Sequence, residues 1–459
     1  MKLAIVGAGS TRLPLMLGSV AAASARLRLR EVSLYDVRPD RMSALLPVGL
    51  ALAAECGPVP AVRVHASPES CLEGADAVVL TVRPGFEEAR ARDERACLEL
   101  GVIGQETTGP AGLAFAARSI PVVAACARAA LASNPACVIA VFTNPAGLVT
   151  QALHALGLPA VGVCDSADVA CRKVARRAGA EPAACDFEVS GLNHLSWTRA
   201  VRGPDGADLL GPALADDAFL ASAFPAFRAE NLRAAGRIPV EYLWYFADPG
   251  AALTALLAEP WTRGEALLEA NRRMLGDVGR LADQGQVGLA IAVYADWLAA
   301  RHASYMKYAM GGVEDGGPGL GLGDGHGDGA FNESDALGSL KAQVGGYAEV
   351  AMDLLAARSG AVPRLMALNV PNGGAVPGLD DDDVVECDCE VDAEGVRPRP
   401  RGPMPAEDLA LVSRVKEYER LAVRAVLTGS SALFEDALAA HPLVPSREVA
   451  GRLVGALGL

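Results

Sequence analysis

Two hydrophobic periods divide the first 165 residues of the chain. Short apolar runs with the length of buried strands lie at 2–6, 31–35, 77–82, 138–142 and 161–163. Stretches with helical spacing, such as 86–99 and 120–132, separate them. Strand and helix therefore alternate, as in repeated βαβ units. The order predicts an α/β fold whose N-terminal part is a Rossmann-like, doubly wound parallel sheet.

The pattern changes after residue 165. Longer helical tracts appear at 215–235 with a break at Pro225, and at 262–282, 287–308, 336–356 and 406–427. Cys387 and Cys389 alternate with acidic residues in a period-two strand over 385–391. Such a Cys-x-Cys pair can bind a metal, but a half-buried strand is the favoured interpretation. We predict two domains, a dinucleotide-binding one at 1–165 and a mixed α+β catalytic one at 166–459.

A glycine-rich segment interrupts the second predicted domain. Ten of the nineteen residues from 311 to 329 are glycine. Because glycine-rich chains gain little from ordering, we expect a flexible surface loop there.

Composition and charge exclude several classes of protein. Hydrophobic residues make up 51% of the chain and charged residues 21%, so global disorder is excluded. The formal charge of −14 repels nucleic acids and anionic membranes. The ten cysteines show no paired spacing, which favours a reducing compartment. Arg12 and Pro14 break the first apolar run before a signal core forms, and we expect no apolar stretch of the ~18 residues that a membrane span needs. We expect a soluble, cytoplasmic protein without nucleic-acid or membrane partners.

A glycine turn follows the first predicted strand. Gly7 and Gly9, with Ser10 and Thr11, open the next helix as in the dinucleotide fingerprint, although its third glycine is missing. Asp36 ends the second strand, where a carboxylate can bind ribose hydroxyls and favours NAD over NADP. The pattern predicts an NAD site; a tight turn without a cofactor is the alternative.

Further polar residues follow the later strands. Arg83 and Arg90 come just after one strand end, where open α/β sheets bind ligands, and are candidates for an anion. Asn144 follows the next strand and could hold substrate hydroxyls or cap a helix. Cys164 ends a further strand, thirty residues before His194. Those two could be metal ligands, a nucleophile with its base, or unrelated core residues.

The order of these motifs resembles glycoside hydrolase family 4, most closely its 6-phospho-β-glucosidases. The resemblance covers nearly the whole chain, and its motifs are GAGST, Arg83 to Arg90, GVIGQETTGP, FTNPAG, the strand end at Cys164, SGLNHLSW, IPxxYLxY, NVPNGG and VKxYERL. The run of motifs in order is more specific than any one of them.

The resemblance implies an enzyme that depends on NAD and on a divalent metal, usually Mn²⁺. It makes Cys164 and His194 the metal ligands, Tyr242 the base that removes the C2 proton, and Asp165 an acid. NAD⁺ would take hydride from C3 of the sugar and return it after elimination, so no net NADH would form. The tyrosine pKa is expected to be lowered by the cation. Tyr242 is preferred over Tyr245 because its spacing from Arg263 is that of the family.

The substrate implied by the resemblance is a small 6-phosphorylated glucoside. Residues that match substrate-binding positions are Arg90, Asn144, Asn193 and Arg263. We also expect a homo-oligomer, although the sequence does not fix its size.

Three departures from the family leave specificity open. Arg12 and the residue after it replace a Tyr-Thr pair beside the cofactor turn, and Asp165 is typical of the α-type branch. The segment 311–329 replaces a turn and an aromatic piece near 330–332. An α-type family 4 glycosidase is therefore one alternative. An NAD-dependent 2-hydroxyacid dehydrogenase and an inactive NAD sensor are two others.

Overall fold

The parallel sheet predicted for the N-terminal part is present. The computed structural model describes the whole 459-residue chain except 307–308, 310–332 and 347, so the expectations for the segments 311–329 and 330–332 lie outside the described residues. Six parallel strands stand in the order β3-β2-β1-β4-β5-β6. Their bounds are β1 (Lys2–Val6), β2 (Glu31–Tyr35), β3 (Ala61–Val64), β4 (Ala77–Leu80), β5 (Val138–Val141) and β6 (Val161–Gly162). This strand order is the one typical of dinucleotide-binding sheets.

Six helices connect and cover these strands. They are α1 (Leu13–Leu27), α2 (Pro39–Cys56), α3 (Pro68–Leu72), α4 (Phe86–Glu99), α5 (Ala111–Ser133) and α6 (Ala146–Ala155). Proline stands in the first turn of α1, α2 and α3, where its missing N–H costs nothing.

Helix α5 differs from the sequence predictions in two ways. It begins nine residues before the predicted start at 120, because Ala111–Ala116 pack into the core ahead of the internal Pro121. It also holds an 18-residue window with a mean hydropathy of 1.4, long and apolar enough to cross a membrane, so the expectation that no such stretch exists was wrong. Of that window 61% is buried inside the protein, as in a helix that covers a sheet.

The second part of the chain extends the same sheet. β6 pairs with the antiparallel β10 (Arg364–Pro371), and the path continues through β11, β7, β8 and β9, with β12 off the edge of β11. The bounds of these strands are β7 (Asp186–Leu192), β8 (Leu195–Arg202), β9 (Ile238–Pro239), β11 (Val384–Val391) and β12 (Val396–Pro398). The strand predicted at 385–391 is confirmed.

That strand is buried on both faces rather than on one. Cys387 and Cys389 pack in the core, with their Sγ atoms 3.8 Å apart. Glu386 and Asp388 are buried as well, because each has partners: Asp388 binds Arg401, and Glu386 accepts a hydrogen bond from Ser196. The polar face of this strand is therefore buried as well, although the alternating sequence predicted a half-buried strand.

The helices of the second part confirm the predicted tracts 262–282 and 406–427 and shorten or divide the other three. Their bounds are α7 (Val169–Arg177), α8 (Leu210–Leu214), α9 (Asp217–Ala223), α10 (Ala229–Ala235), α11 (Trp244–Ala247), α12 (Pro249–Ala258), α13 (Arg263–Asp283), α14 (Val287–Ala303), α15 (Glu333–Lys341), α16 (Glu349–Arg358), α17 (Ala406–Thr428), α18 (Ser431–Ala440) and α19 (Arg447–Leu457), with 3₁₀ turns η1 (Pro182–Ala184) and η2 (Glu241–Leu243). The tract 215–235 divides into α9 and α10 at the predicted break, because Pro225 has no N–H for a continuing helix. Asp216 caps the start of α9 by accepting from the Phe219 amide. The tract 336–356 splits near Gly345, which has φ +121°. The tract from 287 stops being helical at Ala303.

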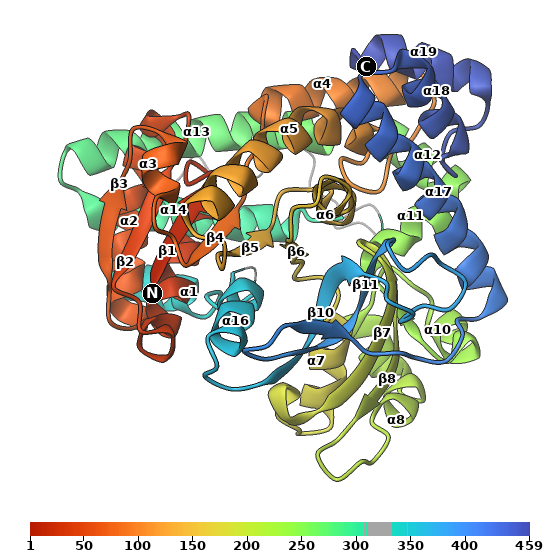
Figure 1. Ribbon diagram of the computed structural model, residues 1–459, viewed down its shortest axis with the longest axis horizontal. Coiled ribbons are helices and arrows are strands. Elements are labelled where there is room, and N and C mark those ends of the chain that lie inside the picture. Colours follow the sequence, from red (N-terminus) through yellow and green to blue (C-terminus); the bar gives the residue numbers. More distant parts are fainter. Residues whose placement is uncertain (307–308, 310–332, 347) are drawn as a thin grey trace.

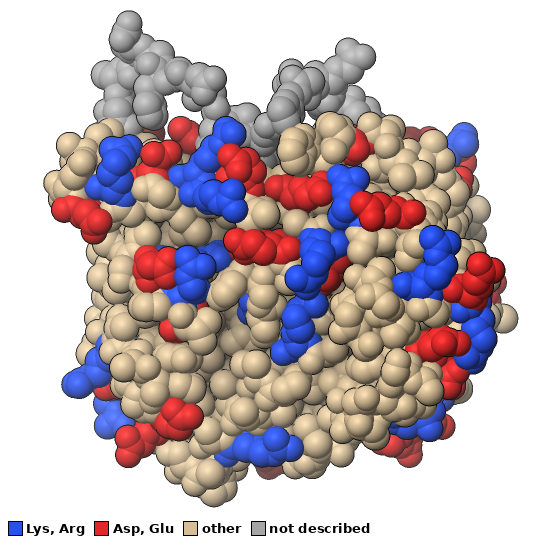
Figure 2. Space-filling view, turned by 90° about the horizontal axis from the view of Figure 1, so that it is seen from above, with Lys and Arg blue, Asp and Glu red and all other residues tan. Residues whose placement is uncertain are grey.

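Helices from the second part lie against the N-terminal sheet unit. α13 packs on α2 and α4, and α16 packs on α1. Figure 1 shows α13 and α14 beside the elements coloured red and orange, while α17 to α19 form a group of their own near the C-terminus. The face seen in Figure 2 carries acidic and basic side chains interspersed. The two predicted domains are thus joined through one sheet and through shared helix contacts.

Candidate active site

A cavity of about 550 Å³ lies at the carboxyl ends of the parallel strands. This is where open α/β sheets bind ligands. Twelve of the thirteen predicted site residues line it: Gly7, Gly9, Ser10, Thr11, Asp36, Arg90, Asn144, Cys164, Asp165, His194, Tyr242 and Arg263. Residues far apart in sequence therefore meet in one space.

The glycine turn between β1 and α1 forms one end of the cavity. Gly7 has φ +99°, and a Cβ there would lie 2.3 Å from the Thr81 carbonyl oxygen. The Gly9 amide donates to Asp36 Oδ2 at 2.7 Å, and a Cβ on Gly9 would meet the same carboxylate. The absence of both side chains lets a ligand approach the backbone, and Asp36 holds the turn against the end of β2.

Cys164 and His194 supply the donor atoms of the predicted metal pair. Cys164 follows β6, and His194 sits in the β7–β8 turn with φ +61°. The buried His194 Nδ1 has no hydrogen-bond partner among the described residues. Burial lowers the pKa of His194 to about 4, so the imidazole is neutral, as a metal ligand must be. Burial, followed by the charge of Glu386, raises the pKa of the Cys164 thiol, and a bound cation would offset this. The donor set fits a divalent transition metal.

Tyr242 lies directly against this pair. Its ring stacks on the His194 imidazole, with centroids 4.0 Å apart and planes 6° from parallel. The Tyr305 hydroxyl donates to Tyr242 Oη at 2.6 Å. Burial and then the neighbouring Glu241 raise the pKa of Tyr242 well above its usual value. The protein groups alone thus do not produce the lowered pKa expected from the sequence.

Arg90 and Arg263, the two arginines at predicted substrate-binding positions, are held in different ways. Arg90 Nε donates to Glu94 at 2.7 Å and its Nη1 pairs with Glu106 at 2.7 Å, so two carboxylates already face this charge. Arg263 Nη1 donates to Ser304 Oγ at 2.7 Å and its Nη2 to the Arg301 carbonyl at 3.0 Å. In these contacts Arg263 donates to neutral oxygens, whereas Arg90 pairs with carboxylates in a buried ion-pair network.

Sequence reasoning missed several polar cavity residues, of which three bear on the chemistry. Glu241, Arg301 and Tyr305 all line the cavity. Burial and the nearby charges of Arg12 and Arg263 lower the pKa of Arg301, which shows that cations cluster here. Arg301 and Tyr305 lay in a tract interpreted only as helix, so nothing in the spacing singled them out. The position of Glu241 next to Tyr242 was the only available signal.

Asn193 is the one predicted site residue outside the cavity wall. Its side-chain amide donates to Glu386 Oε1 at 3.2 Å, and Asn369 donates to the same oxygen at 3.1 Å. Ser196 donates to Glu386 Oε2 at 2.7 Å. The result is a buried polar cluster behind the His194 turn.

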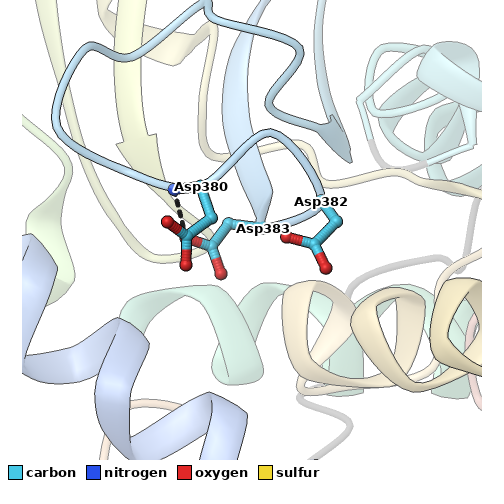
Figure 3. Close-up of side chains that lie close together, drawn as sticks. All are labelled: Asp380, Asp382 and Asp383. Atoms are coloured by element: carbon cyan, nitrogen blue, oxygen red, sulfur yellow. Dashed lines mark hydrogen bonds between the residues drawn. The ribbon is translucent and has the colours of Figure 1, made fainter.

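A second group of acidic residues stands apart from the cavity lining. Asp380, Asp382 and Asp383 lie close together on the β10–β11 loop (Figure 3). Asp383 and Asp380 both pair with Arg420, and the Asp380 amide donates to Asp383 Oδ2. Since Arg420 already pairs with two of the three carboxylates, we assign no metal to them.

Models of one protein family match most of the chain. The model described as family 4 glycosyl hydrolase matches residues 2–180, and that of the family's C-terminal domain matches 189–444. A probable 6-phospho-beta-glucosidase of Bacillus subtilis (strain 168) is 25% identical over 99% of this chain and 95% of its own. A maltose-6'-phosphate glucosidase of Fusobacterium mortiferum is 23% identical over 97% and 94%.

Solved structures share the fold. The 6-phospho-beta glucosidase from Thermotoga maritima, solved with NAD and glucose-6-phosphate, has a TM-score of 0.79 at 23% identity and covers 100% of this chain and 97% of its own. A 6-phospho-alpha-glucosidase from gut microorganisms, also with NAD and glucose-6-phosphate, has a TM-score of 0.80 at 19% identity, over 100% and 96%. Relatives of both anomeric types are therefore similar to this chain.

Proposed function

Since the chain belongs to family 4 of the glycosyl hydrolases, we propose that it hydrolyses 6-phospho-β-glucosides with NAD and a divalent metal. Mn²⁺ is the first candidate for that metal. The observation that supports the proposal is that the glycine turn, the Cys164–His194 pair and Tyr242 line a single cavity. Relatives solved with NAD, Mn²⁺ and glucose-6-phosphate add to it.

Different residues of the cavity would bind the dinucleotide and the cation. The turn at Gly7 and Gly9 would hold the dinucleotide, with Asp36 at the ribose end, and Cys164 and His194 would hold the cation. When bound, NAD⁺ would accept and later return a hydride at C3 of the sugar, and the cation would act as a Lewis acid on the sugar oxygens.

Proton transfer falls to two side chains. Tyr242 Oη would take the C2 proton, which the oxidised C3 makes acidic, and Asp165 would protonate the departing C1 oxygen. Water would then add at C1 and Tyr242 would return the C2 proton, while the bound dinucleotide would supply the hydride that restores C3. The substrate is hydrolysed with no net oxidation, so the same NAD molecule serves every turnover.

The sugar phosphate would be held by the cationic side of the cavity. Arg263 and Arg301 lie there, and Asn144 can bind a sugar hydroxyl. Arg90, fixed between Glu94 and Glu106, would contribute oriented N–H groups rather than an uncompensated charge. Asn193 would act indirectly, by supporting the His194 turn.

The test is a panel of 4-nitrophenyl α- and β-glucosides, each with and without a 6-phosphate, assayed with NAD⁺, Mn²⁺ and a reductant. We expect turnover of the β-anomer with phosphate and no accumulation of NADH. Turnover of the α-anomer alone would assign the α-type activity, which Asp165 next to Cys164 favours. Accumulation of NADH with a 2-hydroxyacid would indicate a dehydrogenase. NAD binding without any turnover would indicate a sensor. A homo-oligomeric state and a cytoplasmic location stay predictions.

A further inference from the structure

The antiparallel helices α4 and α13 contribute to the cavity wall and define its two ends. At one end of α4, Glu87 Oε1 accepts a hydrogen bond from Asn271 of α13, and Glu87 also pairs with Arg41 of α2. At the other end, Glu94 accepts from the amide of Gly264, the second residue of α13. The first end lies beside the turn that would hold the dinucleotide, since Arg38, whose amide donates to Asp36, lies over the Phe86 ring at 5.5 Å. The helical rise puts Leu98, at the second end, ~18 Å further along the wall.

Apolar side chains gather at the second end of the cavity. They are Leu98, Leu256, Pro260, Trp261 and Met306, and the charged Glu259 and Arg263 stand among them in the wall. Met306 belongs to a small hydrophobic cluster against which Leu256 packs. The apolar side chains provide a surface that suits a hydrophobic ring.

Trp261 is exposed in a way that the other tryptophans are not. Its side chain is 51% exposed, whereas Trp197 is 6% and Trp297 0% exposed. Trp244 is half-buried against Tyr245. An indole of this size normally buries most of its surface, so a half-exposed one in a cavity wall indicates a place for a ligand.

The chemistry of the sugar points its leaving group toward this end. In the proposed function, C3 of the pyranose ring would face the nicotinamide and Arg263 would hold the phosphate on C6. C1 and C5 flank the ring oxygen, on the opposite side of the ring from C3. The C1 substituent would therefore lie on the same side of the ring as the phosphate, next to Trp261, which stands two residues before Arg263 and lines the same cavity.

We infer that Leu98, Leu256, Pro260, Trp261 and Met306 form the subsite for the leaving group, with the Trp261 indole stacked on its ring. The inference rests on the proposed function. The occupant is a ring with an apolar face, which an aromatic aglycone and the C–H face of a second sugar both provide. A methyl aglycone cannot reach the indole.

The experiment compares three 6-phospho-β-glucosides: methyl, 4-nitrophenyl and 4-linked glucosyl. Trp261→Ala should lower kcat/KM by about tenfold for the two ring aglycones, the size of a stacked ring contact, and by less than ~2-fold for the methyl compound. Trp261→Phe should recover most of the loss. Loss with only one ring aglycone would identify which of the two the subsite takes. An equal loss with all three substrates would overturn the inference.

A matched control tests whether the exposed indole is instead a contact between subunits. Leu257 is 57% exposed and four residues from Trp261, but it does not line the cavity. Leu257→Ala should leave all three kinetic values unchanged. If Trp261→Ala and Leu257→Ala both change the mass measured by light scattering, the patch is an interface and the subsite is refuted.

Tryptophan fluorescence distinguishes failure of the proposed function from failure of the subsite. A wild-type protein that hydrolyses none of the three compounds refutes that function. Tryptophan emission then decides the subsite alone, because a nitrophenyl ring stacked on indole quenches it. Quenching by 4-nitrophenyl 6-phospho-β-glucoside that Trp261→Phe lacks would support the subsite, and equal quenching in both proteins would overturn it.

Discussion

Replacing Tyr305 by phenylalanine removes one hydroxyl group beside the proposed base. That hydroxyl lies 2.6 Å from Tyr242 Oη and 3.1 Å from Glu241 Oε1, and its single proton can serve one acceptor at a time. The shorter contact is the one to Tyr242. When Tyr242 carries negative charge, this becomes a hydrogen bond to a charged acceptor, worth roughly 1.5–3 kcal/mol. If the charge is present in the rate-limiting step, kcat should fall by about 10- to 150-fold.

The assay measures kcat with the C2–H and the C2–D substrate. Tyr305→Phe should lower kcat and raise the C2 isotope effect, because proton removal becomes slower, while KM should stay within ~2-fold since no substrate contact is lost. Tyr245→Phe is the control: Tyr245 lies four residues from Glu241, is buried and packs edge-on against Trp244. A Tyr305→Phe enzyme with wild-type kcat would refute the role of this hydrogen bond, and loss confined to Tyr245→Phe would move the base to that residue.

Other expected outcomes concern the metal, the dinucleotide and pH. Cys164→Ser should weaken Mn²⁺ binding by at least ~100-fold, measured by the paramagnetic resonance of free Mn²⁺, with unchanged circular dichroism; unchanged affinity would remove Cys164 from the ligand set. Gly9→Ala puts a methyl group 2.7 Å from the Asp36 carboxyl carbon, so calorimetry should show an NAD Kd raised about tenfold, and wild-type affinity would show that the turn holds no dinucleotide. Burial raises the pKa of Glu386 from its ordinary 4.5 to about 7, so the folded state binds more protons between those values and the unfolding free energy of the metal-free protein should fall as pH rises through them. Glu386→Gln should flatten this slope in urea titrations, and identical slopes would place the titration elsewhere.

The N-terminal sheet could be predicted from sequence because its signal is local. β1, β4 and β5 are short apolar runs, because burial on both faces makes such runs continuous. β3 is mostly exposed and contains Arg63, so no apolar run in the sequence marked it. The glycine turn was readable for the same reason, since Gly7 and Gly9 stand at fixed positions after β1.

The rest of the cavity depends on contacts that no local pattern encodes. Arg301 and Tyr305 reach it only because α14 packs beside α13, more than 130 residues after Cys164. Asn193 matched a family position but turns to Glu386, a partner 193 residues away. Sequence pattern located the strand ends, whereas the partners of each charged group required the tertiary structure.

The seam between β6 and β10 determines how the molecule comes apart. One residue pair, Gly162 with Asn369, joins the parallel and antiparallel portions, and a Cβ on Gly162 would lie 2.7 Å from that of Asn369. Cutting the chain near residue 165 would strip the N-terminal fragment of α13, α14 and α16 and leave its last strand open on one edge. The main hydrophobic core draws residues from both sides of residue 165, so heat should melt the intact protein in a single cooperative transition, and the separately made N-terminal part should regain its structure only when mixed with the rest.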